Sequence, residues 1–427
     1  MNKSNTFQII LLGLFGFFII VGMASFILFR GSGSENVSVV IWGTMPSSTF
    51  TEVASVITDA DDRIKISYAE KSPETFDSEF IEALAVGRAP DIILLSDSNI
   101  YRHSDKILSI PYDSLSERDF RSTFLEEGEM FLRGSGISAI PWSIDPLVMY
   151  WNRSLFSNAA VASPPLFWDE FVTLSSKLTK KDQASNIRES AVALGEYRNI
   201  SNAKEILSAL FFQANNPIVR MGEQGLESTL DSNAASGALN FYTEFANPVK
   251  PMYSWNRSLA NSKNRFASGD LAMYFGFASE LSEIRARNPN LNFDVAPLPQ
   301  LRSSRTYKTF GRLQAFAISR TAQNPTGAME VIFKLTSQGP LKRLSELTFL
   351  PPVRRDMLAS KPVGNSAVSV FYDSALISKA WLDPGRTRTS EIFQTMVESV
   401  TSGRQTPSDA IRRASGDMNS VLGVVSQ

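Results

Sequence analysis

The chain has 427 residues, enough for two or three domains, and 43% of them are hydrophobic, so it can build a full core. Lysine and arginine total 42 against 43 for aspartate and glutamate, which gives no electrostatic case for nucleic-acid binding. The absence of cysteine excludes disulfides, thiolate zinc sites, iron–sulfur clusters and cysteine nucleophiles, and a single histidine excludes multi-histidine metal sites. We therefore expect no metal and no cofactor.

An uncharged apolar run opens the chain. Residues 7–29 contain no charged side chain, and as a helix they would span about 34 Å at about 1.5 Å per residue, enough for a bilayer core. Because the run exceeds the usual hydrophobic region of a secretory signal, we favour an uncleaved N-terminal transmembrane helix over a cleaved signal. Residues 31–34, Gly-Ser-Gly-Ser, read as a flexible linker. The segment 1–36 is thus predicted to be a membrane anchor and linker.

From Val37 the chain alternates between strand and helix patterns. Apolar strands are predicted at 37–42, 64–68 and 91–95, with amphipathic helices between them. This order predicts a doubly wound parallel sheet, in which ligands bind beyond the carboxyl ends of the strands. Two such ends are at Trp42 and Asp97. The one histidine, His103, lies in the polar run that follows, so we expect it in a surface loop.

Residues 137–177 read as the first crossing between two lobes, a place where small ligands tend to bind. An apolar strand breaks at Pro141-Trp142, a second strand runs to Trp151, and a Pro-Pro pair precedes a helix. The segment resembles the core of the bacterial extracellular solute-binding proteins of family 1, the sugar-binding type that includes maltose-binding-protein-like chains. The resemblance rests on these residues: Ile140-Pro141, Asp145, Met149 to Arg153, Leu155-Phe156 and Trp168-Asp169-Glu170.

Five further stretches resemble motifs of the same family, namely residues 83–93, 264–276, 293–299, 348–354 and 402–422. Together the matches cover nearly all of residues 37–427. One position departs from the family pattern: Phe167 stands where a threonine usually caps the next helix. A missing oxygen cap costs about 0.5–2 kcal/mol, so we expect another cap or a different helix start.

The resemblance implies an α/β fold of two lobes, the class II periplasmic-binding-protein type, with a helix-flanked sheet in each lobe. Crossings are expected near residues 145, 297 and 346. The first lobe would comprise residues 37–144 and 298–346, and the second lobe residues 145–297 and 347–427.

Candidate ligand-binding residues are the aromatic, acidic and basic side chains at predicted strand ends and crossings. Sugars offer apolar C–H faces between hydroxyl groups, so their sites combine aromatic rings with carboxylates and other polar groups. Any one of these aromatics could equally pack in a core, Asp145 could simply organise a turn, and Arg312 could pair with a carboxylate. The set is Trp42, Asp97, Trp142, Asp145, Tyr150, Trp255, Tyr274, Phe277, Arg312 and Phe349.

The resemblance implies a membrane-anchored extracytoplasmic protein, monomeric, that captures a small solute between its lobes and delivers it to the permease of an ABC importer. A carbohydrate is the expected solute. A peptide or polyamine on the same fold remains open, and a pocket rich in carboxylates without stacked aromatics would favour a polyamine. A surface receptor or adhesin without transport also remains open. We expect no enzyme, because nothing in the sequence sets Asp97 and Asp145 at the separation that glycoside hydrolysis requires.

Overall fold

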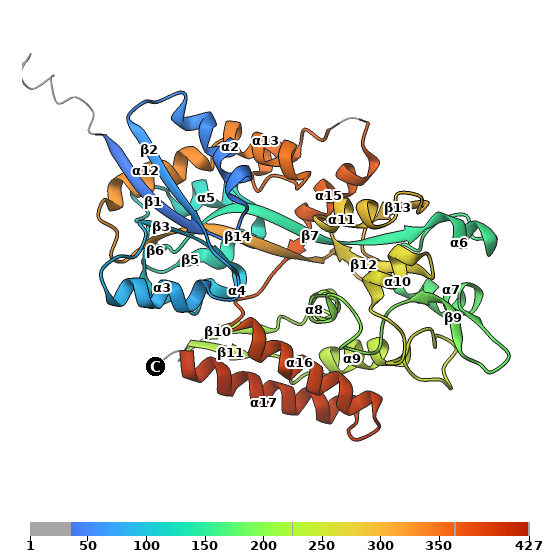
Figure 1. The fold of residues 1–427 in the computed structure, drawn as a ribbon. Helices are drawn as coiled ribbons and strands as arrows, with labels where there is room; N and C mark the ends of the chain where they lie inside the picture. The colour runs from blue at the N-terminus through green and yellow to red at the C-terminus, as the bar shows by residue number, and fades with distance from the viewer. Residues whose placement is uncertain (1–35, 224, 363, 426–427) are drawn as a thin grey trace, which may run out of the picture.

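The computed structural model describes residues 36–223, 225–362 and 364–425 (Figure 1). The predicted anchor at residues 7–29 lies outside these ranges. Within them, no helix combines the length and apolar character that crossing a bilayer requires.

The first sheet is built by parallel strands, as the alternating pattern predicts. β1 (Val37–Gly43) pairs in parallel with β2 (Ile64–Glu70) on one side and with β3 (Ile92–Ser96) on the other. Helices α2 (Ser47–Thr58) and α12 (Pro325–Leu335) pack against these strands. The unbroken apolar run of β3 is buried, as expected for a strand covered on both faces.

Two long strands carry the chain across the molecule. β7 (Ile140–Asn152) pairs antiparallel with β14 (Thr309–Ser319) up to Pro146. From Leu147 onward β7 pairs instead with β12 (Leu271–Phe277) and, on its other side, with β13 (Phe293–Ala296). Since proline has no N–H to donate to a ladder, Pro146 fits the point at which β7 exchanges partners. β7 is therefore hydrogen-bonded along its whole length, and its first half lies in the first lobe and its second half in the second lobe.

The second lobe is built on β12, which also pairs in parallel with β9 (Ile187–Val192). Its helices include α8 (Ala203–Gln213) and α9 (Asn233–Glu244), which pack against each other. The C-terminal helices α16 (Arg386–Thr401) and α17 (Pro407–Val425) lie beside them in red (Figure 1). Segments far apart in the sequence thus build one lobe.

The last passage between the lobes comes late in the chain. The segment around Val353 stays with the first lobe, because Leu125 donates its backbone N–H to the Val353 carbonyl at 3.0 Å. β15 (Ser378–Lys379) still pairs with β14, and α16 then packs on α8 and α9. These contacts place the last passage after Val353 and before α16, whereas the sequence pattern puts it near residue 346.

The remaining elements are short strands, turns and helices at the edges of the two lobes. They are α3 (Phe76–Ala85), α4 (Asp97–Ile100), η1 (Ser104–Lys106), β4 (Ile107–Leu108), α5 (Glu117–Thr123), η2 (Glu126–Phe131), β5 (Leu132–Arg133), β6 (Gly136–Ile137), α6 (Arg153–Asn158), η3 (Trp168–Glu170), α7 (Phe171–Leu178), β8 (Lys180–Lys181), β10 (Val219–Gly222), β11 (Gly225–Ser228), α10 (Ser262–Ser268), α11 (Glu280–Arg287), α13 (Gln338–Thr348), α14 (Arg355–Leu358) and α15 (Ser366–Leu376).

Two local expectations have clear outcomes. At the position where the family has a capping threonine, η3 forms first and α7 begins only at Phe171, without a side-chain cap. The prediction for His103 is wrong, because its side chain is fully buried. Its Nε2 lies 2.8 Å from Oδ1 of Asp77, and its ring meets Phe80 edge-on. The polar neighbours of His103 in the sequence suggested a surface position, but Asp77 on α3 gives the buried imidazole a hydrogen-bond partner.

Candidate functional site

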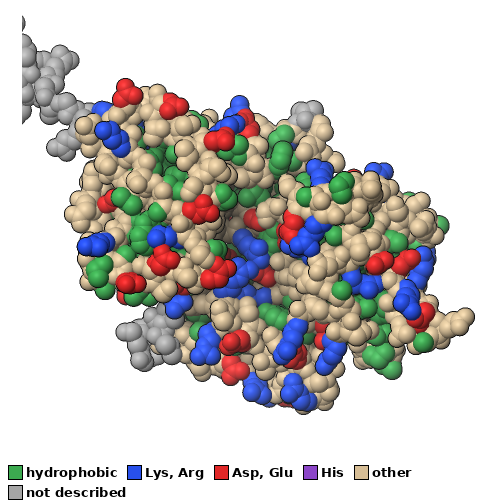
Figure 2. Space-filling model, viewed as in Figure 1, with side chains coloured by type: hydrophobic (Ala, Val, Ile, Leu, Met, Phe, Trp, Pro, Cys, Tyr) green, Lys and Arg blue, Asp and Glu red, His purple; other side chains and the backbone are tan. Residues whose placement is uncertain are grey.

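A cleft with a volume of about 1970 Å³ opens between the two lobes. Figure 2 shows the hollow, with lysine and arginine side chains gathered in it and acidic side chains around it. The lining draws on both lobes and on both long strands. The lining includes Thr44, Ser96, Asp97, Ser143, Asp145, Arg312, Gln314, Gly385, Arg386, Thr387 and Arg388.

The floor of the cleft is a patch on β7 and β14. Arg312 is the cross-strand partner of Asp145, and Gln314 is the partner of Ser143. Side chains two residues apart on a strand share a face, so all four point to the same side. The Ser143 hydroxyl donates to Gln314 Oε1 at 3.0 Å. The pairing register itself therefore assembles donors and acceptors at the floor.

Arg312 is fixed in place by three neighbours. Its guanidinium carbon lies 3.6 Å from the centroid of the Phe277 ring. Its Nη2 donates to Glu205 Oε1 at 3.1 Å and to Asn202 Oδ1 at 3.3 Å. Arg386, at the start of α16, donates to the same Glu205 oxygen at 2.9 Å. Burial opposes ionisation of Glu205, but the arginines outweigh it and lower the pKa of this carboxyl.

A buried ion pair stands behind the cleft wall. Lys204 Nζ lies 2.6 Å from Asp383 Oδ2 and 2.9 Å from Thr389 Oγ1. The Asp383 carboxylate also accepts from the Gly385 amide at 2.9 Å. These contacts tie the passage segment to α8 and so position the residues that enter the cleft.

The two aspartates of the cleft have perturbed acidities. Burial, followed by the nearby Asp383 carboxylate, raises the pKa of Asp97 to about 7. Burial raises the pKa of Asp145 to about 6, although Ser279 donates to it from N at 3.0 Å and from Oγ at 2.6 Å. Both carboxyls can therefore change protonation near neutral pH, which makes them sensitive to a ligand's charge.

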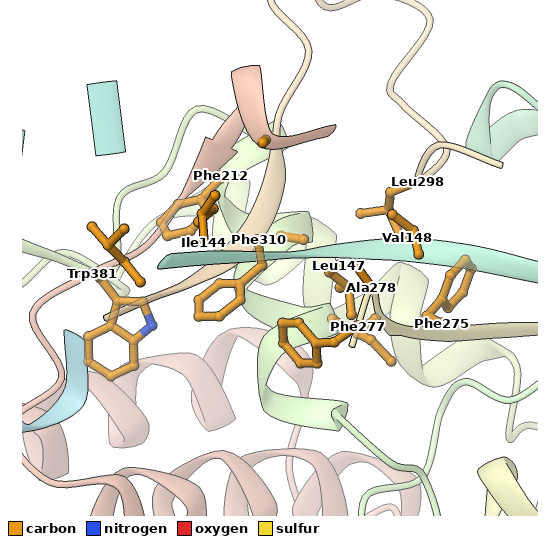
Figure 3. Packing of buried hydrophobic residues seen from close by; sticks show 14 of the residues in the cluster. Ile144, Leu147, Val148, Phe212, Phe275, Phe277, Ala278, Leu298, Phe310 and Trp381 are labelled. Carbon is orange, nitrogen blue, oxygen red and sulfur yellow. The ribbon is translucent and has the colours of Figure 1, made fainter. Parts of the chain in front are cut away.

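Most of the predicted aromatics lie in the core rather than on the cleft surface. Trp142 is fully buried and packs against Phe50 and Phe316. All five of the following are buried: Trp142, Tyr150, Trp255, Tyr274 and Phe277. Figure 3 shows Phe277 near Phe310 and Leu147 in this packing. Phe277 still contributes to the site, because it supports the guanidinium of Arg312.

Trp42 and Phe349 lie outside the described lining of the cleft. The Trp42 ring is covered by the Lys71 ammonium, 3.9 Å from its centroid. Phe349 ends α13 in the left-handed region, with a φ of 61°, and is about half exposed. Of the predicted residues, the structure therefore brings Asp97, Asp145 and Arg312 together at the cleft, with Phe277 beneath.

The sequence analysis missed Glu205, Arg386 and the Lys204–Asp383 pair. Lys204 and Asp383 are 179 positions apart, and no local motif marks them. Among the residues that the structure describes, no cluster of three or more acidic, histidine or cysteine side chains is placed to hold a metal ion. The site offers hydrogen-bond donors, acceptors and charges, which suits reversible binding.

A family model for the bacterial extracellular solute-binding proteins matches residues 55–368, well over half of the chain. The chain belongs to this family. It is therefore a solute-binding protein of an extracellular family, and the fold agrees, since members have two α/β lobes around a cleft. A relative from Deinococcus radiodurans, named "Probable ABC transporter-binding protein", is 22% identical over 68% of this chain and 70% of its own length.

Solved structures share the fold of this solute-binding protein. A cyclo/maltodextrin-binding protein complexed with maltotetraose has a TM-score of 0.75 at 17% identity, covering 91% of this chain and 98% of its own. A cyclic alpha-maltosyl-1,6-maltose binding protein from Arthrobacter globiformis has a TM-score of 0.76 at 14% identity, covering 90% and 99%. At such identities the likeness establishes the two-lobed architecture.

Proposed function

We propose that this solute-binding protein captures a carbohydrate in the cleft and presents it to an ABC importer. The observation that carries the proposal is the cleft itself, lined from both lobes by donors and acceptors on a floor of crossing strands. Its volume of about 1970 Å³ exceeds the roughly 300–1,000 Å³ of typical small-molecule pockets. That size favours an oligosaccharide over a single sugar ring. Two structural neighbours bind maltodextrin-type oligosaccharides, which supports the same solute class.

The physical basis of capture is contact with both lobes. A ligand shifts a conformational equilibrium only through a difference in affinity between the two states. A solute that touches Asp97 on the first lobe and Arg386 on the second favours the closed arrangement over the open one. We also propose that the protein binds its solute without catalysis, that it is a monomer and that its partner is the permease of an ABC importer. In it, residues 1–36 tether the protein outside the cell, and the lobes divide as the sequence analysis predicts except at the last passage, which comes after Val353.

A second candidate solute is a peptide or polyamine. One observation favours it: the aromatic rings predicted as sugar platforms are buried, while carboxylates line the cleft. The fold and the capture step would be the same, and only the chemistry of the solute would differ.

Calorimetric titration of the full chain with malto-, cello-, manno- and chito-oligosaccharides tests the carbohydrate proposal. We expect micromolar binding of at least one of them. Arg312→Met should weaken that binding at least tenfold while the protein stays folded, because Glu205 keeps Arg386 as a partner. Arg257→Met serves as the control, since Arg257 is an exposed residue that pairs with Glu196 away from the cleft. Absence of heat and of a thermal shift with every sugar would refute the proposal.

A further inference from the structure

Several charged side chains at the rim of the cleft have opposite charges beside them in the same lobe. Arg102 pairs with Asp77 at 2.9 Å and Lys106 with Asp105 at 2.7 Å. On the other side Arg388 lies 3.5 Å from Glu391. Such exposed pairs are also screened by water and salt. These paired charges at the rim therefore attract a charged solute only weakly. Discrimination between charged and neutral solutes then depends on the residues of the inner cleft.

Each basic group in and directly behind the inner cleft has an acidic partner, although the buried Nε of Arg312 has no hydrogen-bond partner among the described residues. Arg312 and Arg386 share the Glu205 carboxylate, and Lys204 pairs with Asp383. Asp145 is held by two hydrogen bonds from Ser279. These basic groups therefore have partners within the protein, whereas one acid of the inner cleft has none among the described residues.

Asp97 is that acid. Its residue is only 7% exposed, and it lines the cleft at the carboxyl end of β3. Among the described residues no hydrogen bond or ion pair reaches its carboxylate, although those of Asp145, Glu205 and Asp383 all have partners. Asp97 is therefore the acid of the inner cleft that a solute can pair with.

We propose that Asp97 receives a protonated amine of the solute. The inference rests on the proposed capture of a solute in this cleft and specifies its chemistry. A cationic nitrogen supplies the missing positive charge and makes a charge-assisted hydrogen bond, which is about twice as strong as a neutral one. A neutral hydroxyl would donate a hydrogen bond but leave the charge uncompensated. Two kinds of solute carry such a group: an amino sugar and a polyamine.

The surroundings of Asp97 support this assignment. Burial and Asp383 raise the pKa of Asp97, whereas Arg386, Arg312 and Lys204 only partly offset them. Behind it, Glu127 on η2 is buried with both carboxylate oxygens unpartnered among the described atoms, and burial together with Asp97 raises the pKa of Glu127. Asp383 and Glu127 are both acids, so neither of them can act as a counter-ion for Asp97. A cationic group of the solute can take that role.

The test is calorimetric titration of the full chain at pH 7.0 with four probes: glucosamine tetramer, N-acetylglucosamine tetramer, maltotetraose and spermidine. We expect an amine-bearing probe to bind at least tenfold more tightly than either neutral sugar. Asp97→Asn, which keeps shape and removes charge, should abolish that preference. Asp373→Asn, an exposed carboxylate on α15 away from the cleft, should retain it.

The four probes separate this inference from the carbohydrate proposal. Preference for the glucosamine tetramer supports both. Binding of spermidine alone, lost in Asp97→Asn, supports the amine inference and refutes the carbohydrate proposal. Equal or tighter binding of a neutral sugar overturns the amine inference alone, as does an amine preference that survives in Asp97→Asn. No binding by any probe overturns both. The comparison of probes uses the native chain, so it decides even if the variant fails to fold.

Discussion

Removal of one partner from the buried Lys204–Asp383 pair should destabilise the protein strongly. The side chains are 7% and 6% exposed, and Nζ and Oδ2 lie 2.6 Å apart. In Lys204→Met the Asp383 carboxylate keeps the Thr389 hydroxyl and the Gly385 amide but loses its counter-ion. Breaking a buried pair in this way costs about 3–5 kcal/mol. Because two donors remain, we expect a loss near the lower end, about 3 kcal/mol.

A double variant distinguishes pairing from packing. Lys204→Met combined with Asp383→Leu removes both charges, and replacement of a buried pair by apolar groups is often close to neutral. We therefore expect the double variant to recover at least half of the loss. Lys250→Met is the matched control, since its pair with Glu244 at 3.0 Å is partly exposed and such pairs contribute less than about 1 kcal/mol.

The assay is equilibrium urea unfolding followed by tryptophan fluorescence and far-UV circular dichroism, whose coincidence justifies a single free energy of unfolding. Two outcomes would refute the reasoning. One is a loss of under 1 kcal/mol in Lys204→Met, and the other is a double variant whose loss equals the sum of the single ones. Either would mean that the pair does not hold the passage segment to α8.

Three further predictions follow from the site. Asp97→Asn should gain stability over the native chain between pH 4 and pH 8, because a folded-state pKa of about 7 against 3.8 makes ionisation destabilising as pH rises. The gain should reach about 2–4 kcal/mol, and a pH-independent difference in melting would contradict it. Tyr274→Phe should lower the free energy of unfolding by about 1–3 kcal/mol, because it removes the 2.6 Å hydrogen bond to Glu280. Solute affinity should be unchanged, and a tenfold loss of affinity would place Tyr274 in the site. Phe277→Leu should weaken solute binding about 2- to 30-fold by removing the ring beneath Arg312, and titration showing equal affinity would contradict that role.

The strand ends were predictable because they depend on local patterns. Alternation of apolar residues marks where β3 ends, and the rule for doubly wound sheets then places Asp97 at the cleft. The same holds for the end of β1, although there the lining residue is Thr44 and not Trp42. Strand ends read from a sequence commonly differ from the observed ends by about two residues. The pairing partners of the strand decide which side chain faces the cleft.

Trp142 is a residue for which strand periodicity is not enough. The pairing of β7 with β14 shifts register beside Trp142, and such a bulge interrupts the alternation of faces. Asp145 lines the cleft, whereas Trp142 is buried against Phe50 and Phe316. Glu205 and Arg386 likewise meet only through tertiary packing, and a single sequence gives no local sign of that pairing.

The pairing of charges also determines which parts of the cleft can move together. Arg312, on a strand that crosses both lobes, is tied through Glu205 to α8 and through the same carboxylate to Arg386 on α16. The floor is thereby coupled to the second lobe. Asp97 has no such tie among the described residues, and it stands on the first lobe. Any closure of the cleft must therefore change the distance between Asp97 and a fixed group of arginines. A solute that bridges that distance gains contacts only on closing, and this difference in contact is what allows binding to favour the closed form.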